Sequence, residues 1–160
     1  MVRVAATTPV IGPPSRVRQG RRVRHTVAVP MRWSDMDAYG HVNNVVFLGY
    51  FEMARVDLFF ERATLEERSG LRRGTVVAEH QIRYKRPVVY CAQPLEVQIW
   101  VSGVRAAAFS CHYEVFDQGQ LAVTGSTLLV PYDFTIARPR RLTGEEKEFL
   151  QRWTDEGPTA

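Results

Sequence analysis

Apolar residues recur with a period of two in several stretches of this chain, and such alternation predicts β-strands. In the first, residues 23–31, valines alternate with Arg24 and Thr26. Further strands are predicted at 75–84, 95–104, 106–116 and 121–130. Residues 117–120 read Asp-Gln-Gly-Gln, a hairpin turn whose glycine tolerates positive φ. Because short loops join the last four stretches, we expect them to form an antiparallel meander, closed by Pro131.

A different pattern lies between the first strand and the others. From Val45 to Phe51 almost every residue is apolar, and apolar residues continue to Phe60. A helix that is apolar on most of its circumference is a buried one, so a long buried helix is predicted over about 43–62. Gly49 costs about 1 kcal/mol relative to alanine inside a helix. Close packing of another backbone against the helix would explain why glycine is accepted there.

Together these elements predict an α+β fold in which an antiparallel sheet of about five strands wraps a long central helix. The strands and the helix span 21–135, which we interpret as a single domain. Residues 1–20 have no apolar period and are interpreted as a flexible basic arm. Residues 136–160 form a tail with a short helix, because Thr143 and Glu146 have the spacing of a capping box.

Composition excludes several classes of protein. There is no apolar run of the ~18 residues that a membrane span needs, and prolines interrupt the N-terminal apolar residues of any secretory signal. The 2 cysteines, Cys91 and Cys111, are too few for a disulfide framework or a metal cluster, which favours a cytoplasmic protein. Part of the net charge of +4 comes from arginines between 16 and 24. We interpret this run as a solvated tail and expect no nucleic-acid partner.

Candidate chemistry is concentrated just before the long helix. Six polar or turn-forming residues lie within residues 35–44: Asp35, Asp37, Gly40, His41, Asn43 and Asn44. The first backbone N–H groups of a helix lack internal partners and carry partial positive charge. A carboxylate beside such donors has the components of an acyl-transfer site, namely a base or nucleophile next to an oxyanion hole. A simpler interpretation is that these side chains only cap the helix.

Other chemistries fit the sequence less well. The Asp35-Met-Asp37 start resembles a calcium-binding EF-hand loop, but Val46 stands at the twelfth position, where glutamate is needed. Asp37 and His41 are too few ligands for a metal site. There is no Gly-x-Ser-x-Gly elbow and no phosphate-binding glycine-rich loop. Glu52 and Arg55 have the spacing of a helical ion pair, which we interpret as structural.

The run Arg32-Trp-Ser-Asp-Met-Asp-Ala-Tyr-Gly-His-Val-Asn-Asn44, followed by Phe47, Tyr50, Glu52 and Arg55, resembles the signature of the hot-dog acyl-CoA thioesterases. Within them it is most similar to the 4-hydroxybenzoyl-CoA thioesterase type. The resemblance extends from Val23 to Val130, excludes residues 1–20 and covers the C-terminal helix only loosely. It implies hydrolysis of an acyl-CoA thioester without a metal or bound cofactor, since coenzyme A belongs to the substrate.

The resemblance also implies roles for particular residues. Asp37 would be the catalytic carboxylate. Backbone N–H groups around Asn43 and Asn44 would hold the thioester carbonyl, and Gly40 and His41 would help to position the substrate there. Gly74 and Thr75 would border the carbonyl, and Arg105 would meet the nucleotide end of coenzyme A. The site would be shared between subunits of a homodimer, often paired into a homotetramer.

Two other functions are compatible with the same scaffold. A hot-dog hydratase or dehydratase needs an aspartate–histidine pair, for which Asp37 and His41 are the local candidate, although the motif for that reaction is absent. A non-catalytic acyl-CoA-binding domain would need no base. The sequence leaves open the acyl chain that is accepted and whether Asp37 acts as base or nucleophile.

Overall fold

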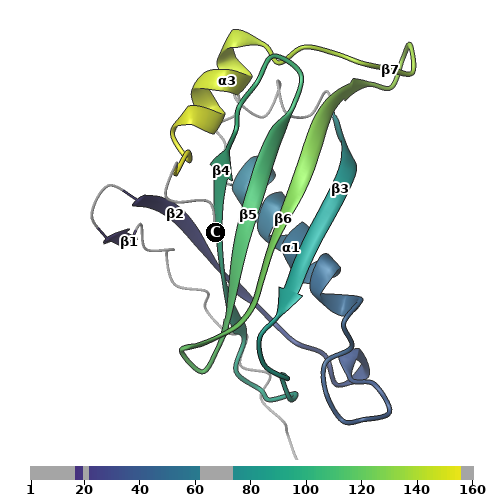
Figure 1. The fold of residues 1–160 in the computed structure, drawn as a ribbon, viewed down its shortest axis with the longest axis vertical. Coiled ribbons are helices and arrows are strands. Elements are labelled where there is room, and N and C mark those ends of the chain that lie inside the picture. The colour runs from purple at the N-terminus through teal and green to yellow at the C-terminus, as the bar shows by residue number, and fades with distance from the viewer. Residues whose placement is uncertain (1–16, 20–21, 62–73, 156–160) are drawn as a thin grey trace, which may run out of the picture.

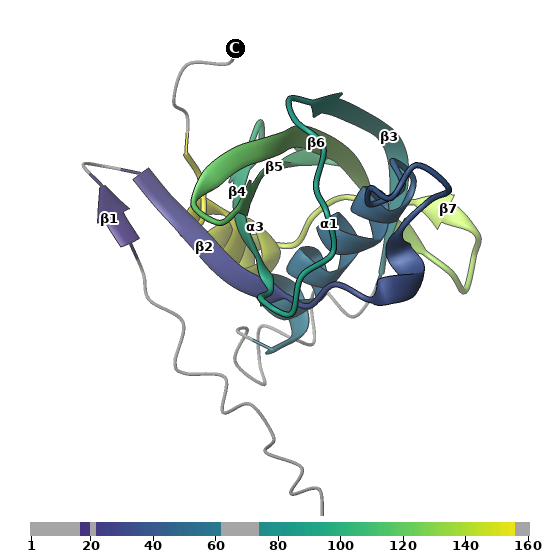
Figure 2. The same ribbon diagram turned by 90° about the horizontal axis from the view of Figure 1, so that it is seen from below.

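An antiparallel sheet curls around one central helix in the computed structural model, which describes residues 17–19, 22–61 and 74–155 (Figures 1 and 2). In chain order the elements are β1 (Val17–Gln19), β2 (Arg22–Val29), α1 (Val46–Val56), β3 (Thr75–Tyr84), β4 (Leu95–Ser102), β5 (Phe109–Asp117), β6 (Gln120–Asp133), β7 (Arg138–Pro139) and α3 (Gly144–Gln151). The predicted α+β class and helix-wrapping sheet are therefore confirmed.

The strands lie in the order β1-β2-β4-β5-β6-β3, and β7 pairs with β6. The predicted meander is correct for β4, β5 and β6 but wrong for β3. This strand pairs with β6 at the edge, with Val76 opposite Val130, whereas β4 pairs with β2, with Val97 opposite Val27. The reason is the connection: residues 85–94 cross from one side of the sheet to the other and contain no tight turn.

The predicted hairpin between β5 and β6 is confirmed by its backbone angles. Gln118 and Gly119 have φ of +50° and +75°, and Asp117 pairs with Gln120. Two central residues with positive φ match the right-handed twist of the flanking strands. β6 is longer than predicted: it runs through Pro131 to Asp133, because Pro131 lies near the strand's end, where a missing N–H is tolerated.

Helix α1 is shorter than predicted and is buried on one face only. Its last residue leads into a π-helical turn, Asp57–Glu61. The buried face carries Phe47, Tyr50, Phe51, Ala54 and Arg55. Val45, Met53, Val56 and Phe60 are exposed, so the expected burial on most of the circumference is wrong for a single chain. Gly49 also lies in open space, because a Cβ added there would have nothing within 4 Å, contrary to the expected close backbone contact.

Close contact between α1 and the sheet occurs instead at Phe51. Its ring stacks on Tyr113 with centroids 4.1 Å apart, and its edge lies over Gly125 of β6. A side chain at Gly125 would occupy the space of this ring. Around this contact the core gathers the inward residues of the central strands and the helix: Val29, Val97, Ile99, Val101, Phe109, Cys111, Leu129, Ala54, Leu58 and Phe59.

The first and last described elements, β1 and α3, join this body, β1 by pairing with β2 and α3 by packing Phe149 and Leu150 in the core. The predicted capping box at α3 is confirmed, since Thr143 N donates to Glu146 Oε2 (2.7 Å) and Thr143 Oγ1 accepts from Glu146 N (3.2 Å). Within the predicted arm, Val17–Gln19 form β1, and the rest of the arm lies outside the described residues, as does the short turn predicted at 64–70. Among the described helices, none has the length and apolar content needed to cross a membrane.

Candidate active site

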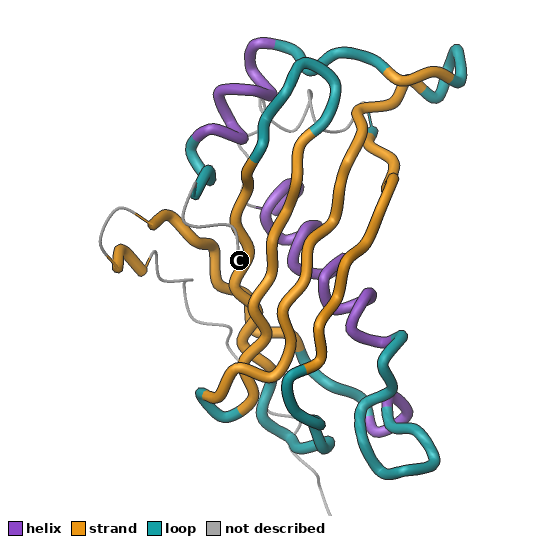
Figure 3. Tube along the Cα trace, in the orientation of Figure 1, coloured by secondary structure: helices purple, strands orange, loops and turns teal. Residues whose placement is uncertain are grey.

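Residues 32–44, here called the Asp37 loop, connect β2 to the turn before α1 (Figure 3). Asp37 N donates to His41 O (2.8 Å), and Gly40 N donates to Asp37 O (3.1 Å). Gly40 has φ of +76°, a conformation that favours glycine. The sequence therefore folds locally into a tight turn, and Gly40 is needed for its backbone.

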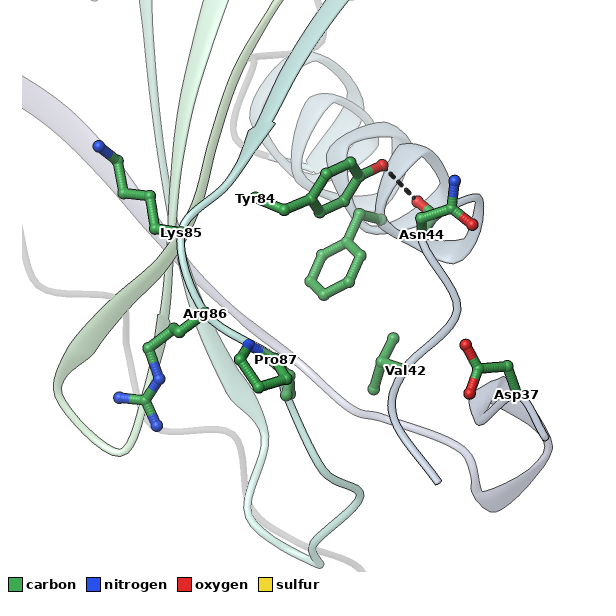
Figure 4. Close-up of a pocket in the computed structure, with 9 residues that line it drawn as sticks. Asp37, Val42, Asn44, Tyr84, Lys85, Arg86 and Pro87 are labelled. Carbon is green, nitrogen blue, oxygen red and sulfur yellow. Dashed lines mark hydrogen bonds between the residues drawn. The ribbon is translucent and has the colours of Figure 1, made fainter. Parts of the chain in front are cut away.

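Backbone donors hold the Asp37 carboxylate within this turn. Oδ1 accepts from Tyr39 N (2.8 Å) and from His41 N (3.4 Å). Within the described part of the chain, Oδ2 has no hydrogen-bond partner. The carboxylate points toward Val42, at the edge of a pocket (Figure 4). One oxygen thus fixes the side chain while the other stays free to accept a proton or to attack.

Asp35, the other acidic residue of the loop, makes hydrogen bonds that hold the loop in place. Its Oδ2 accepts from Arg32 N (2.7 Å) and from the hydroxyl of Tyr50 on α1 (2.7 Å), and its carbonyl accepts from Asn43 N (2.8 Å). Burial and the hydrogen bond to Asp35 raise the pKa of Tyr50, which keeps its hydroxyl a donor at neutral pH. Asp35 therefore ties the loop to the helix, which leaves Asp37 as the available carboxylate.

The entry to α1 differs from a simple capped helix. Its N-cap, Val45, has no side chain that can cap, and Asn43 Oδ1 accepts from Val45 N (3.0 Å) while Asn43 O accepts from Val46 N (3.0 Å). The N–H of Asn43 is used by Asp35, as described above. Among the described residues, no acceptor reaches the N–H of Asn44. Asn44 is therefore the better candidate for an oxyanion donor, and Asn43 shapes the turn.

A pocket of about 370 Å³ opens between the Asp37 loop and the segment that follows β3. It is lined by Asp37, Val42, Asn44, Phe47, Tyr84, Lys85, Arg86, Pro87 and Val88. Val42 N donates to Val88 O (2.8 Å), and the Tyr84 hydroxyl donates to Asn44 O (2.8 Å; Figure 4). Burial raises the pKa of Tyr84, so the phenol remains a donor.

Sequence analysis missed the wall formed by Tyr84 and residues 85–88. No local pattern marks it, because it reaches the Asp37 loop only through tertiary pairing. Its two cations differ in their environment. Arg86 Nη2 lies 3.4 Å from Asp117 Oδ2 in the β5–β6 hairpin, which holds the guanidinium away from the pocket. Lys85 is exposed at the rim of the pocket, where its ammonium group can bind an anionic part of a ligand.

The structure brings together Asp37, Gly40, His41, Asn43 and Asn44, but not the remaining predicted site residues. Gly74 and Thr75 lie at the start of β3, at the end opposite to Tyr84, about 30 Å away at ~3.3 Å per residue. Arg105, in the turn between β4 and β5, lies at that same distant end (Figure 1). A single chain therefore does not combine these residues with Asp37.

Other polar clusters in the described residues serve the fold. Arg55 Nη1 donates to Tyr113 Oη (3.0 Å) and Thr127 Oγ1 (3.4 Å) rather than pairing with Glu52 as predicted, because Arg55 faces the sheet while Glu52 faces outward. No group of three or more potential metal ligands occurs within the part that the structure describes. The Asp37–His41 contact runs through the His41 backbone, with no hydrogen bond of the imidazole to Asp37 in the described residues.

A helix wrapped by an antiparallel sheet, with a carboxylate loop at the helix N-terminus, defines a hot-dog fold. Residues 31–153 match the family model described as the thioesterase-like superfamily. Over 123 residues the chain is 31% identical to protein YsmA of Bacillus subtilis (strain 168), described as uncharacterized, covering 76% of this chain and 82% of that one.

Solved structures show the same fold. A thioesterase from Thermus thermophilus, crystallised with coenzyme A and zinc, is 29% identical, with a TM-score of 0.69 and coverage of 84% of this chain and 96% of that one. A predicted thioesterase from Bacillus stearothermophilus has a TM-score of 0.73 at 19% identity, covering 85% of this chain and 100% of that one. The chain belongs to the thioesterase-like superfamily and is a thioester hydrolase of the hot-dog fold.

Proposed function

We propose that this protein is an acyl-CoA thioesterase in which Asp37 is the catalytic carboxylate, acting as general base or as nucleophile. The free Oδ2 of Asp37 at the mouth of the pocket carries this proposal. The Thermus thermophilus relative crystallised with coenzyme A supports a coenzyme A thioester as substrate. The reaction needs no metal and no resident cofactor, because coenzyme A arrives as part of the substrate.

The residues of the pocket have the properties that hydrolysis requires. As general base, Asp37 accepts a proton from the water that attacks the thioester carbon. As nucleophile, Asp37 attacks that carbon itself and displaces the thiolate, and water then hydrolyses the acyl–Asp37 anhydride to the free acid. The developing oxyanion accepts from backbone donors such as the N–H of Asn44 at the start of α1. In both routes the C–S bond breaks when the first tetrahedral intermediate collapses, and the thiolate takes up a proton as free coenzyme A. Val42, Phe47 and Val88 provide apolar surface for the acyl group.

The direct test is release of free thiol from a panel of short, long and aromatic acyl-CoAs. We expect turnover with at least one of these classes, and the preferred class defines the acyl specificity. Hydration of an enoyl-CoA without thiol release would instead favour a hydratase. Binding of acyl-CoA without either reaction would identify a non-catalytic binding domain.

The edge of the sheet supports a second part of the proposal, that the active form is at least a homodimer. Among the described strands, none pairs with the outer side of β3, although β3 is 10 residues long and largely exposed. Such an edge is a template for another strand. Next to it, α1 exposes Met53, Val56 and Phe60. Two-fold antiparallel pairing of β3 with its copy would cover both surfaces.

The same symmetry would complete the site. In an antiparallel pair the start of one strand lies beside the end of the other, and a two-fold interface uses the same patch twice. Gly74 and Thr75 of the partner subunit would thus approach Tyr84 and the Asp37 pocket. This arrangement resolves the separation of these residues within one chain.

Sedimentation tests this assembly. At micromolar concentration we expect a dimer or a tetramer built from dimers, because a long exposed edge and an apolar helix face together form a large self-complementary surface. A monomer that still hydrolyses acyl-CoA would refute both the dimer and the shared site. Arg18→Lys on β1 is a control for the other edge of the sheet, and it should leave the mass of the assembly unchanged.

A further inference from the structure

Large apolar side chains are exposed at one end of the molecule, on the turn between β6 and β7. In this β6–β7 hairpin, residues 133–138, the side chains of Phe134 and Ile136 are 65% and 63% exposed. The hairpin extends beyond the sheet, past the end at which β3 begins (Figure 1).

Contacts within one chain already define the backbone conformation of the hairpin. Asp133 Oδ1 accepts from Thr135 N (2.9 Å) and Ile136 N (3.4 Å), and Ala137 adopts φ of +52°. The Phe134 ring lies directly on the backbone of Gly74, where a Cβ would approach Phe134 Cε2 to 2.3 Å. Because its backbone is already fixed, the hairpin loses little conformational entropy when it packs against another surface.

The Asp37 loop exposes a second pair of aromatic residues at the opposite end of β3. Trp33 and Tyr39 are 73% and 85% exposed. Hydrogen bonds also fix this loop, since Asp35 N donates to Arg32 O (3.0 Å) and Tyr39 N donates to Asp37 Oδ1 (2.8 Å). Exposed tryptophan and tyrosine on a rigid backbone are typical anchors of protein interfaces.

The positions of these two surfaces are related by the edge strand. The hairpin and the Asp37 loop project past the β3 edge on the same side of the molecule, at opposite ends of the strand (Figure 1). Seen along the strand direction, both lie on the side of the sheet that carries α1 (Figure 2). A two-fold axis beside the outer edge of β3, level with the middle of the strand, therefore places each hairpin against the Asp37 loop of the other chain.

We propose that the partner subunit's Phe134 and Ile136 pack against Trp33 and Tyr39 and form one wall of the active site. This inference rests on the proposed function and extends it, because it adds a structural element from the second copy that positions the catalytic loop. The β6–β7 hairpin excludes water from the side of Asp37 that a single chain leaves open. Exclusion of water strengthens the hydrogen bonds to the oxyanion.

Mixed dimers test whether the hairpin acts across the interface. A chain carrying Phe134→Ser and Ile136→Ser should form a homodimer whose kcat/KM is reduced at least about tenfold, the effect of losing one interface anchor. A chain carrying Asp37→Asn should be inactive as a homodimer. Their hybrid contains one site with both an intact Asp37 and an intact hairpin, so it should recover about half of the wild-type turnover per dimer. A hybrid that remains inactive, or a double variant with wild-type kcat/KM, would overturn the proposal.

A second measurement reads the contact without catalysis. Hydroxyl-radical oxidation of Trp33 and Tyr39 should be several-fold faster in the hairpin variant than in the wild-type dimer, while oxidation of Trp100 on the outer sheet face stays constant. Equal oxidation of Trp33 in both proteins would refute the contact. Ile136→Ser alone provides a milder variant, because Phe134 then keeps its place on Gly74. If wild-type protein releases no thiol, the proposed function fails, and the oxidation result still decides the contact.

Discussion

Asp37→Asn is expected to lower kcat for thioester hydrolysis by at least ~10²-fold, the lower end of what a positioned general base contributes. Asparagine keeps the size of the side chain and an oxygen that accepts from Tyr39 N and His41 N, so the turn should persist. It lacks the basic Oδ2 that faces the pocket. Steady-state kinetics with the preferred acyl-CoA measure the loss, and calorimetry with a non-hydrolysable analogue should show nearly unchanged binding.

Asp35→Asn is the matched control, two residues away in the same loop. Among the described residues, its carboxylate accepts only from Arg32 N and the Tyr50 hydroxyl, and an amide oxygen can accept from both. We expect a much smaller kinetic effect, which arises from loop geometry and is accompanied by a lower melting temperature. An inactive Asp35 variant beside a nearly normal Asp37 variant would show that the catalytic carboxylate has been misassigned.

These two aspartates also show how far the sequence alone could be interpreted. The density of turn formers before an apolar stretch indicated a loop entering a helix, because those residue preferences are local. Local preference did not distinguish the roles of the two carboxylates. That distinction depends on Tyr50, which reaches back from the second turn of α1 to Asp35.

Longer-range features were predicted less well, for the same reason. The alternation at 75–84 correctly predicted a strand. The predicted neighbour of this strand was wrong, because its pairing with β6 depends on the whole sheet. The apolar residues of α1 were predicted to be buried, yet Met53 and Val56 are exposed in one chain. An apolar pattern predicts that residues are buried, but it does not show whether the same chain or a partner subunit buries them. The wall after Tyr84 belongs to this group, since only tertiary pairing with Val42 brings it to Asp37.

Gly125→Ala is expected to lower the free energy of unfolding by about 2 kcal/mol, within the range for overpacking a well-filled core. The new Cβ would lie 2.6 Å from Phe51 Cε2 and 2.8 Å from the backbone oxygen of Gln81. The backbone of β3 cannot yield without breaking its pairing with β6, so α1 must move outward. For a domain of this size the melting temperature should fall by roughly 4–8 °C.

Two comparisons make this prediction specific to the contact between α1 and β6. Gly49→Ala adds the same methyl group where nothing in the same chain lies within 4 Å, and unless the partner subunit packs on this face it should stabilise the helix by about 1 kcal/mol. A lower melting temperature for the Gly49 variant would instead reveal a second chain packed against α1.

Adding Phe51→Leu to Gly125→Ala should cost less than the sum of the single variants, since the smaller side chain relieves the clash. Additive losses would refute this explanation. Because Tyr50 next to Phe51 holds Asp35, outward movement of α1 should also lower kcat, and the double variant should recover part of that loss.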